Sequence, residues 1–188
     1  MVTQKQKREI LAFAKKMVAS NDRFHKMSHI LEAARNAVWL AKEEGADVGV
    51  CWTSAMLHDI CKSKPGNHGT NGAVKAEKFL VSIGMEKASM KKVVDAIHFH
   101  NKEFASGSLE RKILWDADKM TVMSPSGFSN RLLADAVIKY GPDKGIGVAI
   151  RRYHFFYKRF HTKTGRMEIG RNRDGVGKKI LLLQKRKQ

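Results

Sequence analysis

Apolar residues recur at helical spacing along most of the chain, and no stretch shows the strict alternation that is typical of a strand. Over residues 28–44, for example, Ile30, Ala33 and Ala37 fall on one stripe of a helix. Glycine and proline residues punctuate the pattern between these stripes. The sequence therefore predicts an all-α protein, with helices at 4–19, 28–44, 48–62, 68–83, 87–100, 108–123, 128–138, 145–160 and about 166–183.

The last predicted helix has the weakest pattern because several glycines interrupt it. Gly170, Gly175 and Gly177 all lie inside it, and each interior glycine costs about 1 kcal/mol relative to alanine. A basic loop is therefore the alternative for this segment.

Two of the predicted helices should bring a pair of histidines together. Gly45 can end the first helix and Asp47 can cap the next, and so short a connection favours antiparallel packing. His29 lies 16 residues before Gly45 and His58 lies 13 residues after it. At 1.5 Å per residue their heights above the turn are roughly 24 and 20 Å. The two imidazoles should therefore face each other.

Carboxylates occur beside these histidines in unusually apolar surroundings. Asp59 lies in the apolar run 55–60, and Asp118 ends the largely apolar segment 113–118. Burying a carboxylate is costly unless it is paired or bound to a metal. Imidazole and carboxylate ligands without thiolates suit a divalent ion such as Mn, Mg, Fe, Co or Ni. A single histidine in such a setting is more often a hydrogen-bonded core residue.

This order of residues, a lone histidine, then His-Asp, then a distant aspartate, resembles the HD-domain superfamily of metal-dependent phosphohydrolases. Segments 28–30, 57–60 and 116–120 each look like the corresponding family segment. The resemblance points to the small, single-domain branch, which includes nucleotide pyrophosphatases. It implies a compact all-α helical bundle with a metal site between helices, one domain over residues 1–188 with a core at about 22–173, and a basic helix end and tail at 174–188.

The resemblance also implies roles for individual residues. It makes His29, His58, Asp59 and Asp118 the metal ligands. For the two histidines, this match to the family outweighs the alternative of a hydrogen-bonded core residue. The resemblance also makes Asp59 and Lys64 catalytic. One divalent ion, or two, would be bound, with His68 and His100 as phosphate or second-metal contacts. Further substrate contacts are expected at Lys62, Lys119, Arg131, Arg166 and Arg171, for each of which a solvated surface role is an equal alternative.

Three other residues near these motifs leave alternatives open. His25, one turn before His29, is a reserve ligand or a substrate contact. Asp116 either orients a histidine or lies on a helix surface. Lys62 and Thr121 stand where the family often has acidic residues, and both departures remove negative charge near the expected ion.

Composition sets the broad class of the protein. The 188 residues are 43% hydrophobic, which fits one globular domain with a real core. No apolar run is long enough to span a membrane, and the charged N-terminus does not have the pattern of a signal peptide. Cys51 and Cys61 would be about 15 Å apart on one helix, too far for a disulfide. We therefore expect free thiols and a cytoplasmic location.

Charge is the compositional outlier. The formal net charge is +18, and residues 151–188 contain 13 Lys or Arg and two acidic residues. Such a field attracts polyanions, including nucleic acid and multiply charged nucleotides. A solvated basic helix is the alternative explanation.

The preferred interpretation is a metal-dependent hydrolase that acts on a small phosphorylated substrate. A nucleoside or deoxynucleoside triphosphate would be cleaved by metal-bound water with release of pyrophosphate. One alternative is an HD-type nuclease or phosphodiesterase acting on nucleic acid. Another is a non-catalytic nucleotide-binding module that retains the metal.

Overall fold

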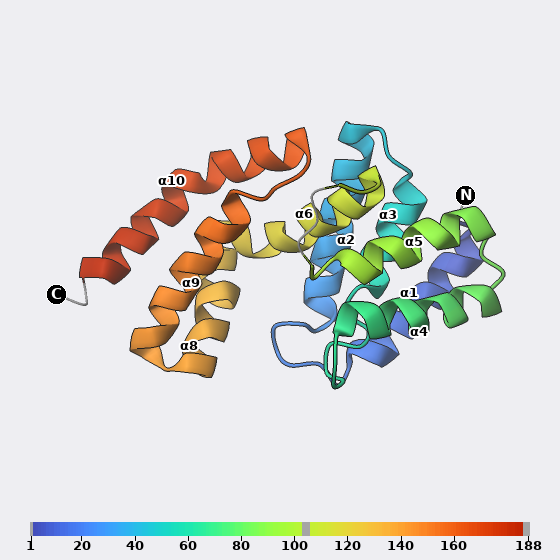
Figure 1. Ribbon diagram of the computed structural model, residues 1–188, viewed down its shortest axis with the longest axis horizontal. Helices are drawn as coiled ribbons and strands as arrows, with labels where there is room; N and C mark the ends of the chain where they lie inside the picture. The colour runs from blue at the N-terminus through green and yellow to red at the C-terminus, as the bar shows by residue number, and fades with distance from the viewer. Residues whose placement is uncertain (1, 103–105, 186–188) are drawn as a thin grey trace. The chain divides into compact units, whose positions relative to one another are not determined.

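The computed structural model describes residues 2–102 and 106–185, and all regular structure in these segments is helical (Figure 1), as predicted. The chain forms two compact units, Met1–Asp118 and Lys119–Gln188, while the expectation of a single domain stays a prediction. The predicted basic tail reaches residues 186–188, which lie outside the described residues. The helices are α1 (Gln4–Val18), α2 (Met27–Glu44), α3 (Val48–Leu57), α4 (His68–Ser82), α5 (Lys87–Phe99), α6 (Leu109–Met123), α7 (Pro125–Gly127), the π-helical η1 (Phe128–Leu133), α8 (Ala134–Tyr140), α9 (Pro142–Tyr157) and α10 (Lys163–Lys185).

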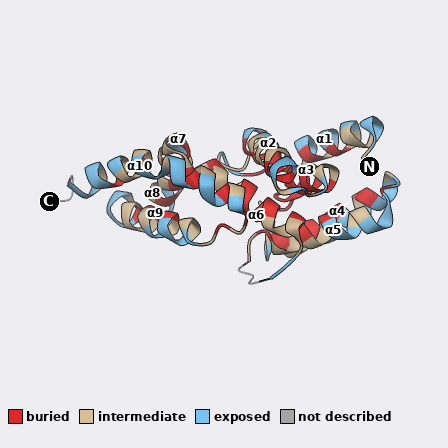
Figure 2. Ribbon diagram, turned by 90° about the horizontal axis from the view of Figure 1, so that it is seen from above, coloured by how far each residue is buried: buried red, intermediate tan, exposed pale blue. Residues whose placement is uncertain are grey.

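The first unit is built around the antiparallel pair α2 and α3. Gly45 ends α2 in a left-handed conformation, with φ at 73°, and its N–H donates to the carbonyl of Ala41. The Asp47 carboxylate then caps α3 by accepting from the N–H of Val50. Both features confirm the predicted turn. Each helix turns a buried face toward its neighbours (Figure 2), and Ile30, Leu40, Leu57 and Ile97 are fully buried.

Helix α3 ends at Leu57, five residues earlier than the sequence predicts. The chain continues through tight turns, in which the N–H of Lys62 donates to the carbonyl of Asp59 and that of Lys64 to Cys61, both at 3.0 Å. After Cys61 the segment is polar, and Pro65 disfavours helical geometry in the residue before it. The prediction missed this change because the apolar run extends to Cys61. As a result, His58 and Asp59 lie in a turn and not in a regular helix.

In the second unit, α7, η1 and α8 follow one another without a break. The Ser124 hydroxyl accepts from the N–H of Gly127, and Pro125 occupies the first turn. This segment therefore begins before residue 128, where the sequence placed its start. Helix α9 packs on α8 and η1, and α10 packs on α7 and α9. Because α10 is helical over Lys163–Lys185, the basic-loop alternative is wrong.

Two expectations about the chain as a whole can be compared with this fold. Cys51 and Cys61 are both buried free thiols, as predicted. Within the described residues, no helix is long and apolar enough to cross a membrane.

Candidate metal centre

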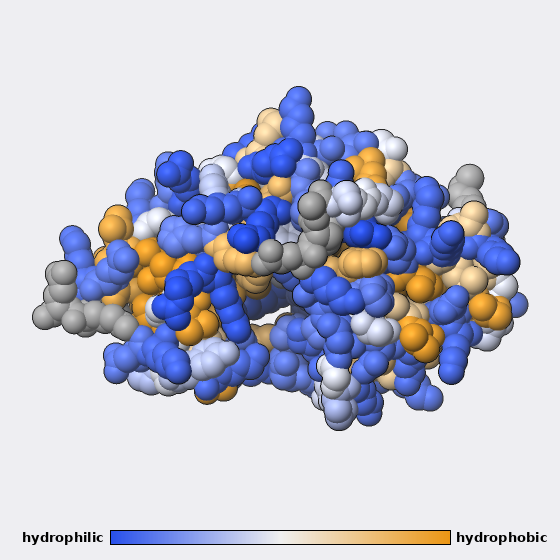
Figure 3. Space-filling model, viewed as in Figure 1, coloured by the Kyte–Doolittle hydropathy of each residue, from blue (hydrophilic) through white to orange (hydrophobic). Residues whose placement is uncertain are grey.

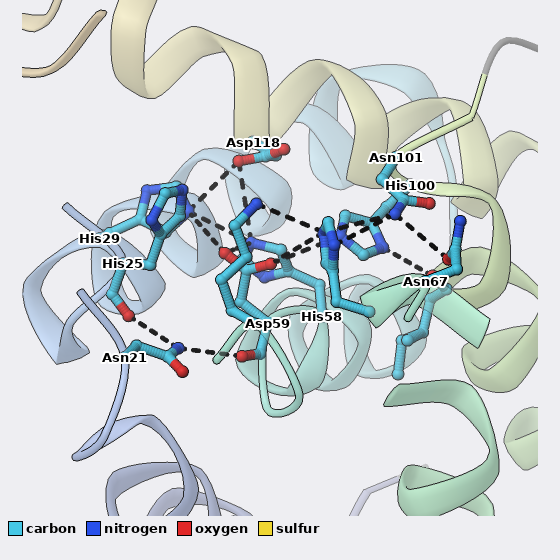
Figure 4. A network of polar contacts seen from close by, with 12 residues as sticks. Asn21, His25, His29, His58, Asp59, Asn67, His100, Asn101 and Asp118 are labelled. Atoms are coloured by element: carbon cyan, nitrogen blue, oxygen red, sulfur yellow. Dashed lines mark hydrogen bonds and ion pairs between the residues drawn. The ribbon is translucent and has the colours of Figure 1, made fainter. Parts of the chain in front are cut away.

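Two histidines and two carboxylates converge in the interior of the first unit (Figure 4). His29 comes from α2, His58 and Asp59 from the turn after α3, and Asp118 from α6. The Nε2 atoms of His29 and His58 are 3.2 Å apart. Asp118 Oδ1 lies 3.3 Å from His29 Nε2 and 3.7 Å from His58 Nε2. The sequence therefore correctly placed these four side chains side by side.

Hydrogen bonding determines which ring nitrogen of His58 faces the cluster. His58 Nδ1 lies 2.7 Å from the carbonyl of Ala55. Because a carbonyl can only accept, Nδ1 carries the proton and Nε2 presents a lone pair. Burial lowers the pKa of His58 to about 4, so that the ring is neutral near pH 7. A neutral imidazole held in this tautomer is ready to act as a metal ligand.

The contact between His29 and His58 provides a test of whether a cation fits. Both rings are buried, and the Nδ1 of His29 has no hydrogen-bond partner in the described part of the chain. If Nε2 carries a lone pair on each ring, the two face each other at 3.2 Å with carboxylate oxygens close by. Only a proton or a cation between them removes this repulsion. The donor set therefore fits a divalent ion held by nitrogen and oxygen ligands.

Asp59 links this group to a second pair of histidines. Its Oδ2 lies 3.7 Å from His29 Nε2 and 3.5 Å from His58 Nε2, whereas its Oδ1 lies 3.5 Å from both His68 Nε2 and His100 Nε2. Burial by itself raises the pKa of Asp59. The imidazoles of His58 and His100 and the charge of Lys62 outweigh burial and hold that pKa well below its usual range. Asp59 is thus an ionised carboxylate at the centre of the network.

His100 has the same tautomer as His58. Its Nδ1 donates to the carbonyl of Ile97 at 2.6 Å, while the buried Nε2 has no hydrogen-bond partner of good geometry among the described residues. His68 lies beside it with the ring centroids 5.0 Å apart. Burial and the charge of Lys62 lower the pKa of His68 to about 3. The structure therefore brings His68, His100 and Lys62 to the cluster, as the sequence predicted.

His25 and Asp116 can now be placed. His25 pairs through Nδ1 with the Asp22 carboxylate at 2.8 Å, and its ring meets the ring of His29 edge-on at 5.6 Å. It lies beside the cluster, although its Nδ1 is occupied by Asp22. Asp116 is fully buried, so the alternative of a helix-surface residue is wrong.

The other predicted substrate residues have contacts of their own. Lys64 is exposed, and its charge acts on the thiol of Cys61. The other four predicted substrate residues belong to the second unit. Within that unit the Lys119 ammonium lies over the ring of Phe156, Arg131 donates to the carbonyl of Thr121, Arg166 donates to the carbonyl of Phe160, and Arg171 pairs with Glu168. Substrate contacts by Lys64, Lys119, Arg131, Arg166 and Arg171 stay predictions.

Sequence reasoning missed the asparagines that support the site. The buried Asn21 donates through Nδ2 to the carbonyls of His25 and Asp59, at 3.0 Å each, and so joins the two turns that carry ligand-type residues. Asn101 lies with Nδ2 3.3 Å from Nδ1 of His68. Neither asparagine stands in an apolar run, which was the signal that identified Asp59 and Asp118.

Comparison with known families gives an independent view of this site. The HD domain family model matches residues 27–123, just over half of the chain. Over 104 residues, or 53% of this chain, the sequence is 35% identical to ribonuclease Y of Cutibacterium acnes. It is 32% identical to ribonuclease Y of Acetivibrio thermocellus over 103 residues. In both cases the match covers 18% of the relative, so the chain corresponds to under a fifth of its length.

Solved structures are similar over nearly the entire chain. Bacillus subtilis YpgQ in complex with ADP has a TM-score of 0.81 at 23% identity, covering 98% of this chain and 96% of that one. An HD-superfamily hydrolase from Bacillus thuringiensis gives 0.78 at 20% identity, with 97% of each chain covered. A predicted HD superfamily hydrolase from an uncultured Thermotogales bacterium gives 0.69 at 24% identity, with 96% and 92% covered. At these identities the likeness establishes a shared fold.

Proposed function

Because the chain belongs to the HD domain family, we propose that it hydrolyses nucleoside or deoxynucleoside triphosphates and releases pyrophosphate. The observation that carries this proposal is the group of imidazole nitrogens and carboxylate oxygens formed by the buried His29, His58 and Asp59 with the partly exposed Asp118. The family match and this group together confirm the expected metal-dependent hydrolase of the HD superfamily. The substrate and the bond that breaks are the proposed part.

The four residues suit a divalent ion by their chemistry. His29 and His58 would supply neutral nitrogens, and Asp59 and Asp118 would supply oxygens. When bound there, such an ion supplies a Lewis acid for a phosphoryl oxygen and lowers the pKa of a coordinated water. This chemistry suits hydrolysis of a phosphoanhydride.

The remaining polar groups of the site suit a polyphosphate. Lys62 places an ammonium 3.4 Å from His68 Nε2, and the two can contact phosphate oxygens from the same side of Asp59. The exposed Lys64 follows two residues later and can reach a more distant phosphate. Several successive phosphates would engage more of these charges than a monophosphate. The ADP in the similar Bacillus subtilis structure also supports a nucleotide ligand.

The experiment that tests this proposal is hydrolysis of a nucleotide panel by protein loaded with Mn²⁺, with products separated by ion-exchange chromatography. A nucleoside monophosphate with pyrophosphate is the expected pair of products. A nucleoside diphosphate with inorganic phosphate would place the cleavage at the other anhydride bond. No product from any nucleotide, in protein that binds Mn²⁺, would contradict the proposed substrate class.

Cleavage of RNA is a second candidate, favoured by the ribonuclease Y relatives and by the distribution of charge. The second unit contains 17 basic and four acidic residues, a formal +13 of the total +18. Hydrophilic side chains cover most of the face seen in Figure 3. This candidate predicts cleavage of labelled single-stranded RNA, with binding that weakens steeply as salt rises. If the RNA stays intact while nucleotides are hydrolysed, RNA cleavage is excluded and nucleotide hydrolysis is the candidate that is retained.

A further inference from the structure

One face of α9, in the second unit, carries a row of exposed cations. Residues 144–158 include four Lys or Arg and no Asp or Glu. At about 100° per residue, Lys144, Arg151, Phe155 and Lys158 fall within a sector of roughly 60°, and all four side chains are exposed. The row runs along roughly 21 Å of helix at 1.5 Å per residue. We call these four residues the α9 row.

Two exposed aromatic rings lie among these cations. The guanidinium carbon of Arg159 lies 3.7 Å from the ring centroid of Phe155. Tyr140, at the end of α8, has the Lys144 ammonium 5.8 Å and the Arg152 guanidinium carbon 6.0 Å from its ring centroid. Tyr140 is 42% exposed and Phe155 is 37% exposed. Both rings therefore offer aromatic surface to solvent beside positive charge.

The Asp135 carboxylate of α8 is paired and does not neutralise the α9 row. It lies 3.2 Å from the guanidinium of Arg152 and 2.7 Å from the ammonium of Lys139. The second unit as a whole has a formal charge of +13. A surface of this charge attracts polyanions and raises their rate of association.

Exposed rings beside cations suit single-stranded nucleic acid better than other polyanions. The bases of a single strand are free to stack on aromatic side chains while its phosphates contact the cations. In a duplex the bases stack on one another, so Phe155 and Tyr140 would have no base to contact. A membrane surface favours a helix with a wide apolar face, whereas three of the four residues in the α9 row are charged.

We propose that the α9 row and Tyr140 bind single-stranded nucleic acid. Lys144, Arg151 and Lys158 contact phosphates, while Phe155 and Tyr140 stack on bases. Neither kind of contact involves the sugar, so RNA and DNA strands should bind alike. This surface lies in the second unit, and its binding does not depend on whether the first unit hydrolyses nucleotides or RNA.

The first experiment tests the phosphate contacts by fluorescence anisotropy of labelled oligouridylate and oligothymidylate strands of about 12 nucleotides, within the usual site size. The full-length protein is used in EDTA, so that metal-dependent cleavage does not occur. The logarithm of the association constant should fall linearly with the logarithm of the salt concentration. Replacing the three cations of the α9 row together by Gln should make this slope shallower by about 2, because each phosphate contact on a single strand contributes about 0.7.

The matched control removes the same charge from the first unit. Lys78→Gln, Lys87→Gln and Lys91→Gln combined change exposed lysines of α4 and α5. This variant should keep the salt dependence of the wild type. An equal change of slope in the two triple variants would show that only net charge matters and would overturn the proposal. So would a failure of the wild type to bind either strand at low salt, a result that leaves nucleotide hydrolysis untouched.

The second experiment tests stacking. Phe155→Leu keeps an apolar side chain but removes the ring, and it should weaken strand binding by about tenfold without changing the salt dependence. Phe155→Trp, which retains a ring, should bind like the wild type, and binding of a duplex should not differ between wild type and Phe155→Leu. Unchanged strand binding by Phe155→Leu would overturn the proposal. Loss of binding to phosphatidylserine vesicles, but not to strands, in the triple variant of the α9 row would instead identify a membrane as the partner and also overturn it.

Discussion

The metal centre depends on which nitrogen of each imidazole carries the proton. In His58 and His100 the Nδ1 atom lies within hydrogen-bond distance of the backbone carbonyl three residues earlier, so that Nε2 is left to face Asp59. This arrangement is local to each turn and needs no partner from elsewhere in the chain. The residues around Asp59 are therefore oriented as ligands before an ion arrives.

Asp118 gives a direct test of the ligand set. Asp118→Asn removes one negative charge and leaves the shape nearly unchanged. It should weaken Mn²⁺ binding by about 100-fold. That is the upper end of the loss seen when a residue that only supports a ligand is changed, and a direct ligand should contribute at least as much. Isothermal titration calorimetry measures the change. Asp143→Asn, in the second unit, is the control and should bind Mn²⁺ like the wild type, and equal affinity in both variants would exclude Asp118 as a ligand.

The buried His58 predicts how the metal-free protein responds to acid. Its pKa is about 4 in the folded state and 6.5 as the ordinary value, so the unfolded state binds more protons between these limits. The free energy of unfolding therefore falls as pH drops through this window, by about 2 kcal/mol from pH 7 to pH 5 for this residue. Urea unfolding in EDTA at the two pH values measures the fall. His58→Gln should reduce it by that amount, and an unchanged pH dependence would contradict the assignment.

At the residue scale, the sequence predicted which ligand-type side chains lie together, but it did not predict the residues that support them. His58, Asp59 and Asp118 were identifiable because charged residues inside apolar runs must be compensated. Asn21 was not identifiable, because it does not lie in an apolar run. It donates to two backbone carbonyls that come close together only in the folded protein.

At the scale of elements, the end of α3 matters most for the site. Helical periodicity carried the predicted helix to residue 62, but the chain turns after Leu57. Ile60 and Cys61 are buried in the tight turns. A short apolar run of this kind does not by its pattern alone distinguish a helix from turns. The helix boundaries marked by Gly45 and Asp47 were predictable because both act locally.

Glycines in α9 and α10 provide a matched test of helix packing in the second unit. A Cβ at Gly145 would lie 2.6 Å from Cα of Val137 in α8, whereas a Cβ at Gly177 would meet nothing within 4 Å. Gly145→Ala should therefore destabilise the protein by about 1–3 kcal/mol because backbone has to move. Gly177→Ala should stabilise it by up to about 1 kcal/mol. Thermal unfolding distinguishes the two, and similar effects would contradict the described packing.

At the scale of the whole molecule, chemistry and charge are divided between the two units. The ligand-type residues lie in Met1–Asp118, and most of the net charge lies in Lys119–Gln188. The concentration of positive charge toward the C-terminal end was predictable, because the formal charge of a segment is the sum of its charged residues. It did not indicate the division into two compact units, because no linker composition marks residue 118.

This division predicts where bound metal stabilises the protein. At a free concentration 100 times its dissociation constant, Mn²⁺ should raise the free energy of unfolding of the unit that binds it by about 2.7 kcal/mol. Hydrogen exchange should therefore slow in α2, α3 and the part of α6 before Lys119. It should change little in α8, α9 and α10. Equal slowing in both units would contradict a metal site confined to the first.

We infer that the cluster around Asp59 binds a divalent ion, and we propose that the protein uses it to hydrolyse a phosphorylated nucleotide. The most direct measurement is the rate of nucleotide hydrolysis by wild type and Asp59→Ala over a series of Mn²⁺ concentrations. Turnover should saturate with Mn²⁺ in the wild type and fall by roughly three orders of magnitude or more in Asp59→Ala, because the variant loses a ligand of the ion that would polarise the phosphate. Equal turnover by the two proteins, or turnover that is unaffected by removal of the metal, would contradict this proposal.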